Sequence, residues 1–572
     1  MAFSGGVKLG DLDDFIGLSQ ECVKPLIQAA DGAKAQLQSV SEAKAVPVSE
    51  APQVQQPNLI KTKQSSSDPK AQIGQVSLSD CLACSGCVTS AETVLLQEQS
   101  GEEFLKRVQA ARLTVVSISA EARTSLAAYT KESPLMCMRK AAEGLRRLGA
   151  AYVLDASAAE AVALLEGKAE FIQRFKATSG GSSGSRKGRL PLLTSHCPGW
   201  TLYAEKVVDP SVLPHLSPIR PPQIVQGRLV KTCLLEAHNR RQLHRRWRAS
   251  NPLFALQSQL ESRFRKPEAS WEPVKPSEVY HVFVQPCYDR KIEAARPSFE
   301  VPGEPGIKEV DTVLTASELL TLLRESGEDC CGGCGKSACE KTEPSNLPPC
   351  PPHSEVLTDL FLGNLQARRP APLLCAVQGN AGSGGFLEHV FREAARELFS
   401  IDLSASPLSL QKKQNEDMRE VLLKDPKTQK VLLRFTAAYG FRNIQNVIRR
   451  IGKVNGDALG DFVEIMACPG GCLNGGGQIA EKADEGEKSQ AARRQRLESL
   501  EQLLLETCVP PAEHPLVLPI YHYIATQVSA PQGPLNSLVG SEAARGWLSA
   551  DWRSLKVDSE GKDVMSSAVL KW

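Results

Sequence analysis

Residues 466–478 read Met466-Ala467-Cys468-Pro469-Gly470-Gly471-Cys472-Leu473-Asn474-Gly475-Gly476-Gly477-Gln478. Two cysteines three residues apart can present both thiols from one tight loop, because proline and glycine let the backbone turn sharply. The same residue types bring backbone N–H groups toward the sulfides of a bound cluster. This stretch therefore indicates an iron–sulfur site, and the rest of the fold has to supply the remaining ligands.

Two further stretches carry one such cysteine each. They are Leu193-Thr194-Ser195-His196-Cys197-Pro198-Gly199-Trp200 and Gln285-Pro286-Cys287-Tyr288-Asp289-Arg290-Lys291-Ile292-Glu293. Each cysteine lies at or just after a predicted strand end, which is where open α/β sheets place ligands. We expect Cys197, Cys287, Cys468 and Cys472 to hold one cluster. The alternative is four buried structural cysteines, which are common in proteins.

A second set of cysteines lies near the N-terminus. Cys81, Cys84 and Cys87 have the Cys-x2-Cys-x2-Cys spacing of ferredoxins, which wraps three thiolates around a cubane cluster. The local fourth position of that pattern is Ala91, so the fourth ligand has to come from elsewhere, and Cys22 is the upstream cysteine that could supply it. A zinc knuckle, or a three-cysteine cluster with an open corner, remains the alternative.

Composition narrows the class of protein. The 572 residues are 42% hydrophobic and 23% charged, with a formal net charge of +2, so binding to nucleic acid or to an anionic membrane is not expected. No apolar run approaches the ~18–20 residues of a membrane span, and the N-terminus resembles neither a secretory signal nor a transit peptide. We expect a cytosolic or nuclear protein whose 17 cysteines are metal ligands or free thiols.

Strand and helix patterns alternate along most of the chain, which favours a parallel α/β architecture. The expected strands are residues 113–118, 151–155, 280–284, 311–315, 373–377 and 461–466, and the expected helices are 141–148, 158–165, 386–398 and 481–506.

The three core stretches resemble, in order, the three motifs of iron-only hydrogenases. Together with the N-terminal cysteines, they make the chain similar to the eukaryotic hydrogenase-like family, which includes cytosolic iron–sulfur assembly factors and a prelamin A recognition factor. The resemblance implies an α/β fold with two parallel-sheet lobes around a buried cluster and a small N-terminal iron–sulfur region. It also implies two [4Fe–4S] clusters, one on Cys22, Cys81, Cys84 and Cys87 and the other on Cys197, Cys287, Cys468 and Cys472.

Two departures from the hydrogenase motifs bear on activity. His196 stands where hydrogenases have a proton-relaying cysteine, and Arg290 stands where they have a lysine, whereas Glu293 is retained. Arginine does not give up a proton at usable pH. We therefore expect no enzymatic activity, and we interpret His196 as a hydrogen-bonding residue that orients its loop.

The expected domain organisation has three parts. Residues 1–105 form the N-terminal iron–sulfur region with a disordered linker at 30–76, and residues 106–480 form the two-lobed core. Residues 481–572 form a helical extension and tail. The basic stretch 233–275 and the cysteine-rich stretch 328–353 do not match the family, and we interpret both as insertions.

The chain ends in Leu570-Lys571-Trp572. A terminal aromatic side chain with a free carboxylate can be captured by a pocket, so Trp572 is a candidate partner-binding residue, and a frayed tail is the alternative. The resemblance implies a component of cytosolic iron–sulfur protein assembly that connects an early cluster scaffold, the targeting complex and apo client proteins. The rival hypotheses are a hydrogenase-like oxidoreductase and a nuclear prelamin A-binding protein.

Overall fold

The computed structural model describes residues 7–9, 74–76, 98–179, 190–250, 272–325, 384–403, 408–451, 459–479 and 490–555. The chain divides into two compact units, Met1–Leu78 and Ser79–Trp572. In the first unit, strand β1 (Val7–Leu9) pairs antiparallel with strand β2 (Gly74–Val76), which occupies the end of the stretch expected to be a linker. The expected strand at 373–377 and the cysteine-rich stretch 328–353 lie outside the described residues.

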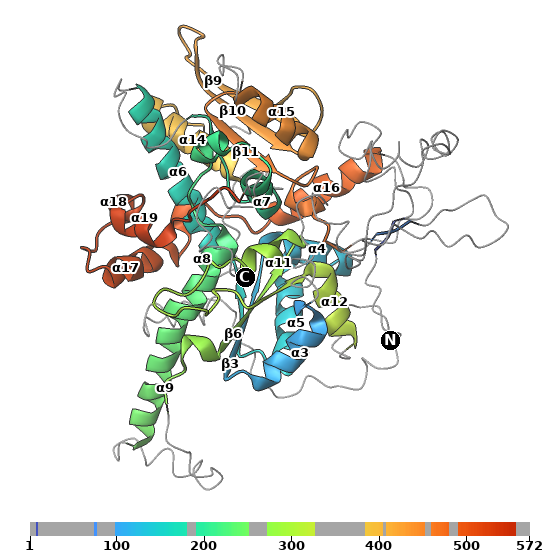
Figure 1. Cartoon of the computed structure of the whole chain (residues 1–572), viewed down its shortest axis with the longest axis vertical. Helices are drawn as coiled ribbons and strands as arrows, with labels where there is room; N and C mark the ends of the chain where they lie inside the picture. The colour runs from blue at the N-terminus through green and yellow to red at the C-terminus, as the bar shows by residue number, and fades with distance from the viewer. Residues whose placement is uncertain are drawn as a thin grey trace, which may run out of the picture. The chain divides into compact units, whose positions relative to one another are not determined.

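The second unit contains a four-stranded, fully parallel sheet with the strand order β4-β3-β6-β7 (Figure 1). All four strands were expected from the sequence. Strands β3 and β6 are buried along their whole length, as expected for a parallel sheet covered on both faces. The strands are β3 (Leu113–Ile118), β4 (Tyr152–Asp155), β6 (Val279–Gln285) and β7 (Thr312–Thr315), and the helices packed around them are α3 (Gly101–Ala110), α4 (Ala120–Thr130), α5 (Pro134–Arg147) and α12 (Ala316–Glu325).

The second sheet of this unit has five strands in the order β5-β11-β10-β9-β8 and is mixed. Its strands are β5 (Leu192–Leu193), β8 (Gln411–Lys412), β9 (Met418–Lys424), β10 (Val431–Tyr439) and β11 (Phe462–Met466). Strands β5, β11 and β10 are parallel, as expected, but β9 and β8 run antiparallel to their neighbours.

The difference from an all-parallel lobe has a local cause. Only a short loop connects β9 to β10, and such a loop joins antiparallel neighbours only, because a parallel pair needs a long crossover. Asp425 begins this loop, and its carboxylate accepts hydrogen bonds from the backbone N–H groups of Lys427 and Thr428 at 2.7 and 2.9 Å.

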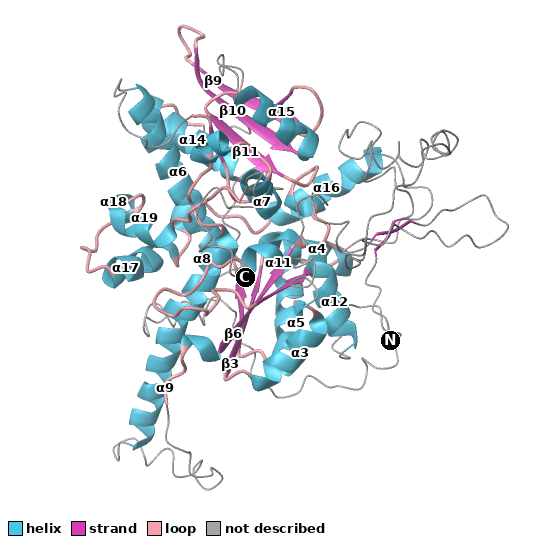
Figure 2. Ribbon diagram, in the orientation of Figure 1, coloured by secondary structure: helices cyan, strands magenta, loops and turns pink. Residues whose placement is uncertain are grey.

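Helices flank the mixed sheet and close the larger hydrophobic core (Figure 2). Helices α6 (Ser157–Ser179) and α14 (Phe386–Phe399) pack against each other, α14 also contacts β10 and β11, and α15 (Phe441–Ile451) contacts β10. At the centre of this core, the rings of Phe435 and Phe462 stack with their centroids 4.7 Å apart.

Helix α8 (Pro222–Leu229) continues through a π-helical turn, η4 (Val230–Leu234), into helix α9 (Leu235–Ser250). The stretch expected to be an insertion from residue 233 therefore begins inside the core, because Cys233, Leu234 and Leu235 are buried. Arg240 and Arg241, farther along α9, are exposed. Within the described part of the chain, no helix has both the length and the apolar character that a bilayer crossing requires.

The C-terminal segment is helical, as expected, and it packs into the core. Its helices are α16 (Gln490–Leu505), α17 (Val517–Gln527), α18 (Leu535–Leu538) and α19 (Glu542–Leu548). Tyr521 of α17 is buried and donates a hydrogen bond to the carboxylate of Glu166 at 2.7 Å. The segment is thus part of the globular unit.

Short helical turns occur along the large unit. They are η3 (Pro210–His215), η6 (Pro276–Glu278), α11 (Asp289–Ala294), η8 (Cys472–Asn474) and η9 (Pro511–Glu513).

We predict that His514, at the start of this segment, makes the protein acid-sensitive. Its Nδ1 accepts a hydrogen bond from the Leu516 N–H at 3.2 Å, and its Nε2 lies 3.0 Å from the Ser157 hydroxyl. Burial lowers the pKa of His514 from 6.5 to about 4. The unfolded chain therefore binds a proton that the folded chain does not, and stability is lost as the pH falls from 6.5 toward 4. At pH 5 this loss amounts to about 2 kcal/mol.

Urea unfolding at pH 7 and pH 5 measures this loss. His514→Gln, which does not titrate, should lose about 2 kcal/mol less between the two pH values than the unsubstituted chain does. An equal loss in both proteins would contradict the prediction, whatever their absolute stabilities.

Candidate metal centre

The four core cysteines come from both sheets of the large unit. Cys197 follows β5 and is the N-cap of helix α7 (Pro198–Lys206), and Cys468 and Cys472 follow β11 in the mixed sheet. Cys287 follows β6 in the parallel sheet. All three strands deliver their cysteines at their carboxyl ends, so Cys287 from the parallel sheet lies near the cysteine loops of the mixed sheet, between the two lobes.

The structure brings the four thiols within electrostatic reach of one another. Burial is the main cause that raises the pKa of each thiol. Other thiols add to it for Cys287, Cys468 and Cys472. The pKa of Cys287 is raised further by Cys468 and Cys197, and that of Cys472 by Cys197 and Cys287. Four thiolates that face one another in a desolvated site repel strongly, so a bound cation or metal cluster is what would hold them ionised.

Backbone N–H groups point at these sulfurs. The N–H of Ala467 donates to the Cys197 sulfur, with an N···S distance of 3.3 Å. The N–H groups of Trp200 and Gly476 donate to Cys197 and Cys468 respectively, and each of these bonds lowers the pKa of its thiol. Donors aimed at sulfur stabilise its ionised form, so the site is prepared for thiolate ligands.

The glycines of the 466–478 stretch are required by its geometry. Gly470 and Gly471 have φ angles of +74° and +85°, which L-residues with a side chain rarely adopt. Gly477 donates its N–H to the Pro286 carbonyl at 2.9 Å, and a Cβ on Gly475 would overlap that same carbonyl oxygen. The loop that carries Cys472 is therefore clamped directly beside Cys287.

Charged side chains surround the thiols. Burial by itself lowers the pKa of Arg290, but Glu293 and the thiols of Cys287 and Cys472 raise it above its usual value. The Arg290 guanidinium pairs with Glu293 at 2.8 Å, and its Nη2 lies 3.2 Å from His196 Nε2. This contact agrees with the expectation that His196 makes a hydrogen bond. Burial, and then Arg290, lower the pKa of His196 well below its usual value.

One site residue was missed by the sequence reasoning. Glu121, in the first turn of α4, is buried, and its carboxylate lies within 4.8 Å of ligand atoms of His196 and Cys472. Glu121 follows β3, and β3 ends at the same sheet edge as the neighbouring strand β6, which delivers Cys287. The sequence predicted both strands but not their pairing, so it could not place Glu121 at the site.

The donor set fits an iron–sulfur cluster. Such clusters are held by four cysteine thiolates that receive N–H hydrogen bonds on sulfur. The site supplies four convergent thiols, three N–H donors to them, and a glycine loop without side chains on the cluster's flank. Four cysteines also suit zinc, and the comparisons with known proteins separate these two possibilities.

The family described as "Iron only hydrogenase large subunit, C-terminal domain" matches residues 112–244 and 259–476. The mouse protein "Cytosolic iron-sulfur assembly component 3" is 37% identical over 492 residues, which cover 85% of this chain and 86% of the relative. The chain belongs to the hydrogenase-like family of cytosolic iron–sulfur assembly proteins. "Protein NAR1" of Arabidopsis thaliana is also 37% identical, over 498 residues that cover 85% of this chain and 86% of that protein.

The fold of this family member is that of an iron-only hydrogenase. The HydA1 hydrogenase from Chlamydomonas reinhardtii superposes with a TM-score of 0.53 over 80% of this chain and 99% of that chain, at 20% sequence identity. The family match also covers residues 233–244 and 259–275 of the basic stretch, and its second part spans the cysteine-rich stretch 328–353, so the expectation that neither stretch matches the family was wrong for most of both. It does not cover residues 245–258, which include the last arginines of α9.

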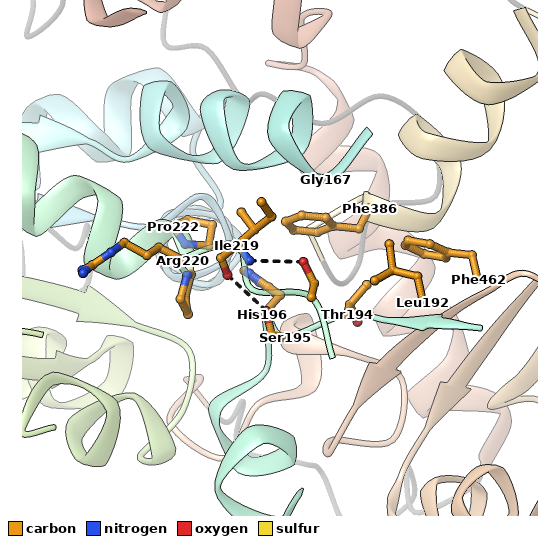
Figure 3. A pocket seen from close by; sticks show the side chains of 12 residues that line it. Gly167, Leu192, Thr194, Ser195, His196, Ile219, Arg220, Pro222, Phe386 and Phe462 are labelled. Atoms are coloured by element: carbon orange, nitrogen blue, oxygen red, sulfur yellow. Dashed lines mark hydrogen bonds between the residues drawn. The ribbon is translucent and has the colours of Figure 1, made fainter. Parts of the chain in front are cut away.

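A small cavity lies beside His196 and the end of β5 (Figure 3). Its volume is about 10 Å³, which is room for one water molecule. The Ser195 hydroxyl in its wall donates to the Ile219 carbonyl at 3.1 Å. The side chains that line it in Figure 3 include His196, Phe386 and Phe462. The cavity is therefore mainly apolar, with the imidazole at its edge.

The remaining predicted site residues lie outside the described residues. They are Cys22, Cys81, Cys84 and Cys87 of the N-terminal set and Trp572 at the C-terminus. Their roles stay predictions that rest on spacing and on the resemblance to the family.

We predict that Gly475→Ala disrupts the centre. The added methyl group would overlap the Pro286 carbonyl, so the loop has to move away from Cys287, at a cost of roughly 1–3 kcal/mol. The melting temperature and the absorbance of the reconstituted protein should both fall. Gly546→Ala is the matched control, because nothing lies within 4 Å of a Cβ at that position. Equal behaviour of the two variants would show that the clamp is unimportant.

Proposed function

We propose that this protein acts in the maturation of cytosolic and nuclear iron–sulfur proteins as a non-enzymatic carrier or adaptor that binds two [4Fe–4S] clusters. One observation carries the proposal. Strands of two separate sheets bring Cys197, Cys287, Cys468 and Cys472 together between the two lobes. The names of its relatives, a cytosolic iron–sulfur assembly component among them, support a role in the maturation of iron–sulfur proteins.

The core site has the features of a permanent structural centre. The thiols would hold the cluster, and the clamped glycine loop would fix their spacing. Leu497 of α16 touches Gly470, and Leu500 and Leu504 of the same helix pack with Leu473. These leucines cover one side of the cysteine loop, whose Cys468 and Cys472 are half-buried. A cluster bound there would join the lobes, so its role is to stabilise the fold and, when bound, to supply one-electron chemistry.

The N-terminal site would be the exchangeable one. Cys81, Cys84 and Cys87 with Cys22 would hold the second cluster, because three of them have ferredoxin spacing. We propose that this cluster is received from an early cluster scaffold and passed on, through the targeting complex, to apo client proteins. The site of action would be the cytoplasm, with the nucleus as a second compartment.

Hydrogen-evolving activity is the rival function, and the fold is its only support. The relay position holds His196, whose Nε2 is engaged by Arg290. The cavity that the described residues form beside it has room for about one water molecule. Both features favour the carrier. Hydrogen production measured with a strong chemical reductant would detect the rival activity.

We predict about eight irons per chain after anaerobic reconstitution, four for each cubane. Cys472→Ala should bind about four irons and lose soluble protein, because the core loses a ligand between its lobes. Cys84→Ala should also bind about four irons but stay soluble. Cys137→Ala is the control, since Cys137 is buried in the parallel-sheet core, away from the site.

Iron, acid-labile sulfide and EPR spectra of the reduced protein measure this stoichiometry. Saturation of the unsubstituted chain near four irons would contradict the two-cluster proposal. Equal losses of soluble protein in Cys472→Ala and Cys84→Ala would contradict the assignment of the core as the structural site.

We predict that the tail docks on the targeting complex through Trp572. An aromatic anchor of this kind often contributes about 2 kcal/mol or more, so deletion of Trp572 should weaken the association at least ~30-fold. Both clusters should survive, since no proposed ligand lies beyond Cys472. Lys571→Glu should strengthen docking if the pocket prefers an acidic neighbour. Unchanged affinity after the deletion would show that the contact lies elsewhere.

A further inference from the structure

The proposed core site carries more negative than positive charge. Its four thiolates are joined by three buried carboxylates: Asp289 raises the pKa of Cys197, Cys287 and Cys468, Glu121 raises that of Cys472, and Glu293 pairs with Arg290 at 2.8 Å. Arg290 acts in the opposite sense and lowers the pKa of all four thiols. A cluster that gains an electron in this site adds further negative charge to a region of low dielectric.

The fold holds Arg290 rigidly in this position. The residue is 3% exposed. Its backbone carbonyl accepts a hydrogen bond from Gln223 Nε2 at 3.0 Å, and its Nη1 donates to Glu293 at 2.8 Å. Among the described residues its Nε is buried without a hydrogen-bond partner. A guanidinium with a free, buried N–H donor next to four thiols is available to an anionic group that those thiols hold.

Arg290 also fixes the protonation state of His196. A guanidinium can only donate, so the contact of Arg290 Nη2 with His196 Nε2 at 3.2 Å requires Nε2 to accept. In the neutral imidazole the proton is then on Nδ1. That Nδ1 is buried and has no partner within the described part of the chain. His196 therefore has no free lone pair with which to bind a metal, although it lies close to Cys472 and Glu121, and it is a hydrogen-bond donor at the edge of the site.

We propose that Arg290 is a positioning residue that raises the reduction potential of the core cluster, directly through its charge and indirectly by holding His196 as a donor. The proposal rests on the proposed function, because it requires a cluster on the four core cysteines. The step is the transfer of one electron from a low-potential donor to the cluster, with no bond broken. Arg290 stabilises the reduced form, whose negative charge is greater by one.

The experiment is a potentiometric titration of the full-length Cys84→Ala chain, in which only the core site is expected to load. After anaerobic reconstitution, dithionite is the reductant and EPR of the reduced cluster is the readout. Arg290→Gln removes the charge and should lower the reduced-to-oxidised ratio at a fixed potential at least tenfold, which is about 59 mV for a one-electron couple. Arg290→Lys keeps the charge but loses the planar fork, so it should give a smaller decrease.

Two further variants test whether the reduced-to-oxidised ratio follows the sign of the charge that is removed. Glu121→Gln removes a negative charge beside Cys472 and should raise the ratio. Arg112→Gln is the matched control, because Arg112 immediately precedes β3 at the sheet edge opposite the site and pairs with Glu278 at an exposed position. The control should leave the ratio unchanged, since an exposed distant charge is screened by solvent and salt.

The outcomes separate this inference from the proposed function. If the Cys84→Ala chain binds no iron and sulfide, the core cluster and the inference fall together. If it loads but Arg290→Gln and Arg112→Gln titrate alike, only the inference is overturned. If Arg290→Gln does not fold, Glu121→Gln decides the matter, because a raised ratio supports the charge argument and an unchanged ratio refutes it.

Discussion

Four thiols that face one another in a desolvated site are the constraint on which the structure depends. Each has its pKa raised by burial and by its neighbours, so without a bound metal the site favours neutral thiols, and with one it favours ionised ligands. A metal or cluster bound to these thiols would therefore stabilise the folded arrangement of the loops that carry them. The loop clamped on Pro286 and the N–H donors to sulfur serve the same arrangement.

A buried ion cluster joins α8 and the start of β7 to the C-terminal segment, and one of its members, Arg220, lines the same small cavity as His196. Glu309, fully buried, pairs with Arg220 at 2.9 Å and Arg228 at 2.6 Å. The two guanidinium groups also donate to the backbone carbonyls of Trp547 and Ser549 in the C-terminal segment. Such a group is costly to desolvate but strongly destabilising to break, so it specifies how α8, β7 and the C-terminal helices meet.

The likeness to hydrogenases extends to the fold, and a fold does not fix the chemistry that its sites perform. In this chain Arg290 engages the imidazole of His196 beside the core cysteines, and the cavity next to that imidazole has a volume of about 10 Å³. The proposed function is therefore argued from these residues and not from the fold.

The sequence alone identified the family and the four strands of the parallel sheet and predicted the cysteine ligands, because glycine, proline and cysteine at fixed spacing record local backbone requirements. It did not reveal the β9–β10 hairpin, although the loop between the two strands begins with the turn-favouring pair Asp425-Pro426, or the packing of α17 and α19 into the core. Only the tertiary structure decided that Glu121 lies beside Cys472 and that Arg290 contacts His196. These contacts join residues far apart in the chain, and the spacing of residues along a sequence carries no information about which distant side chains a fold brings together.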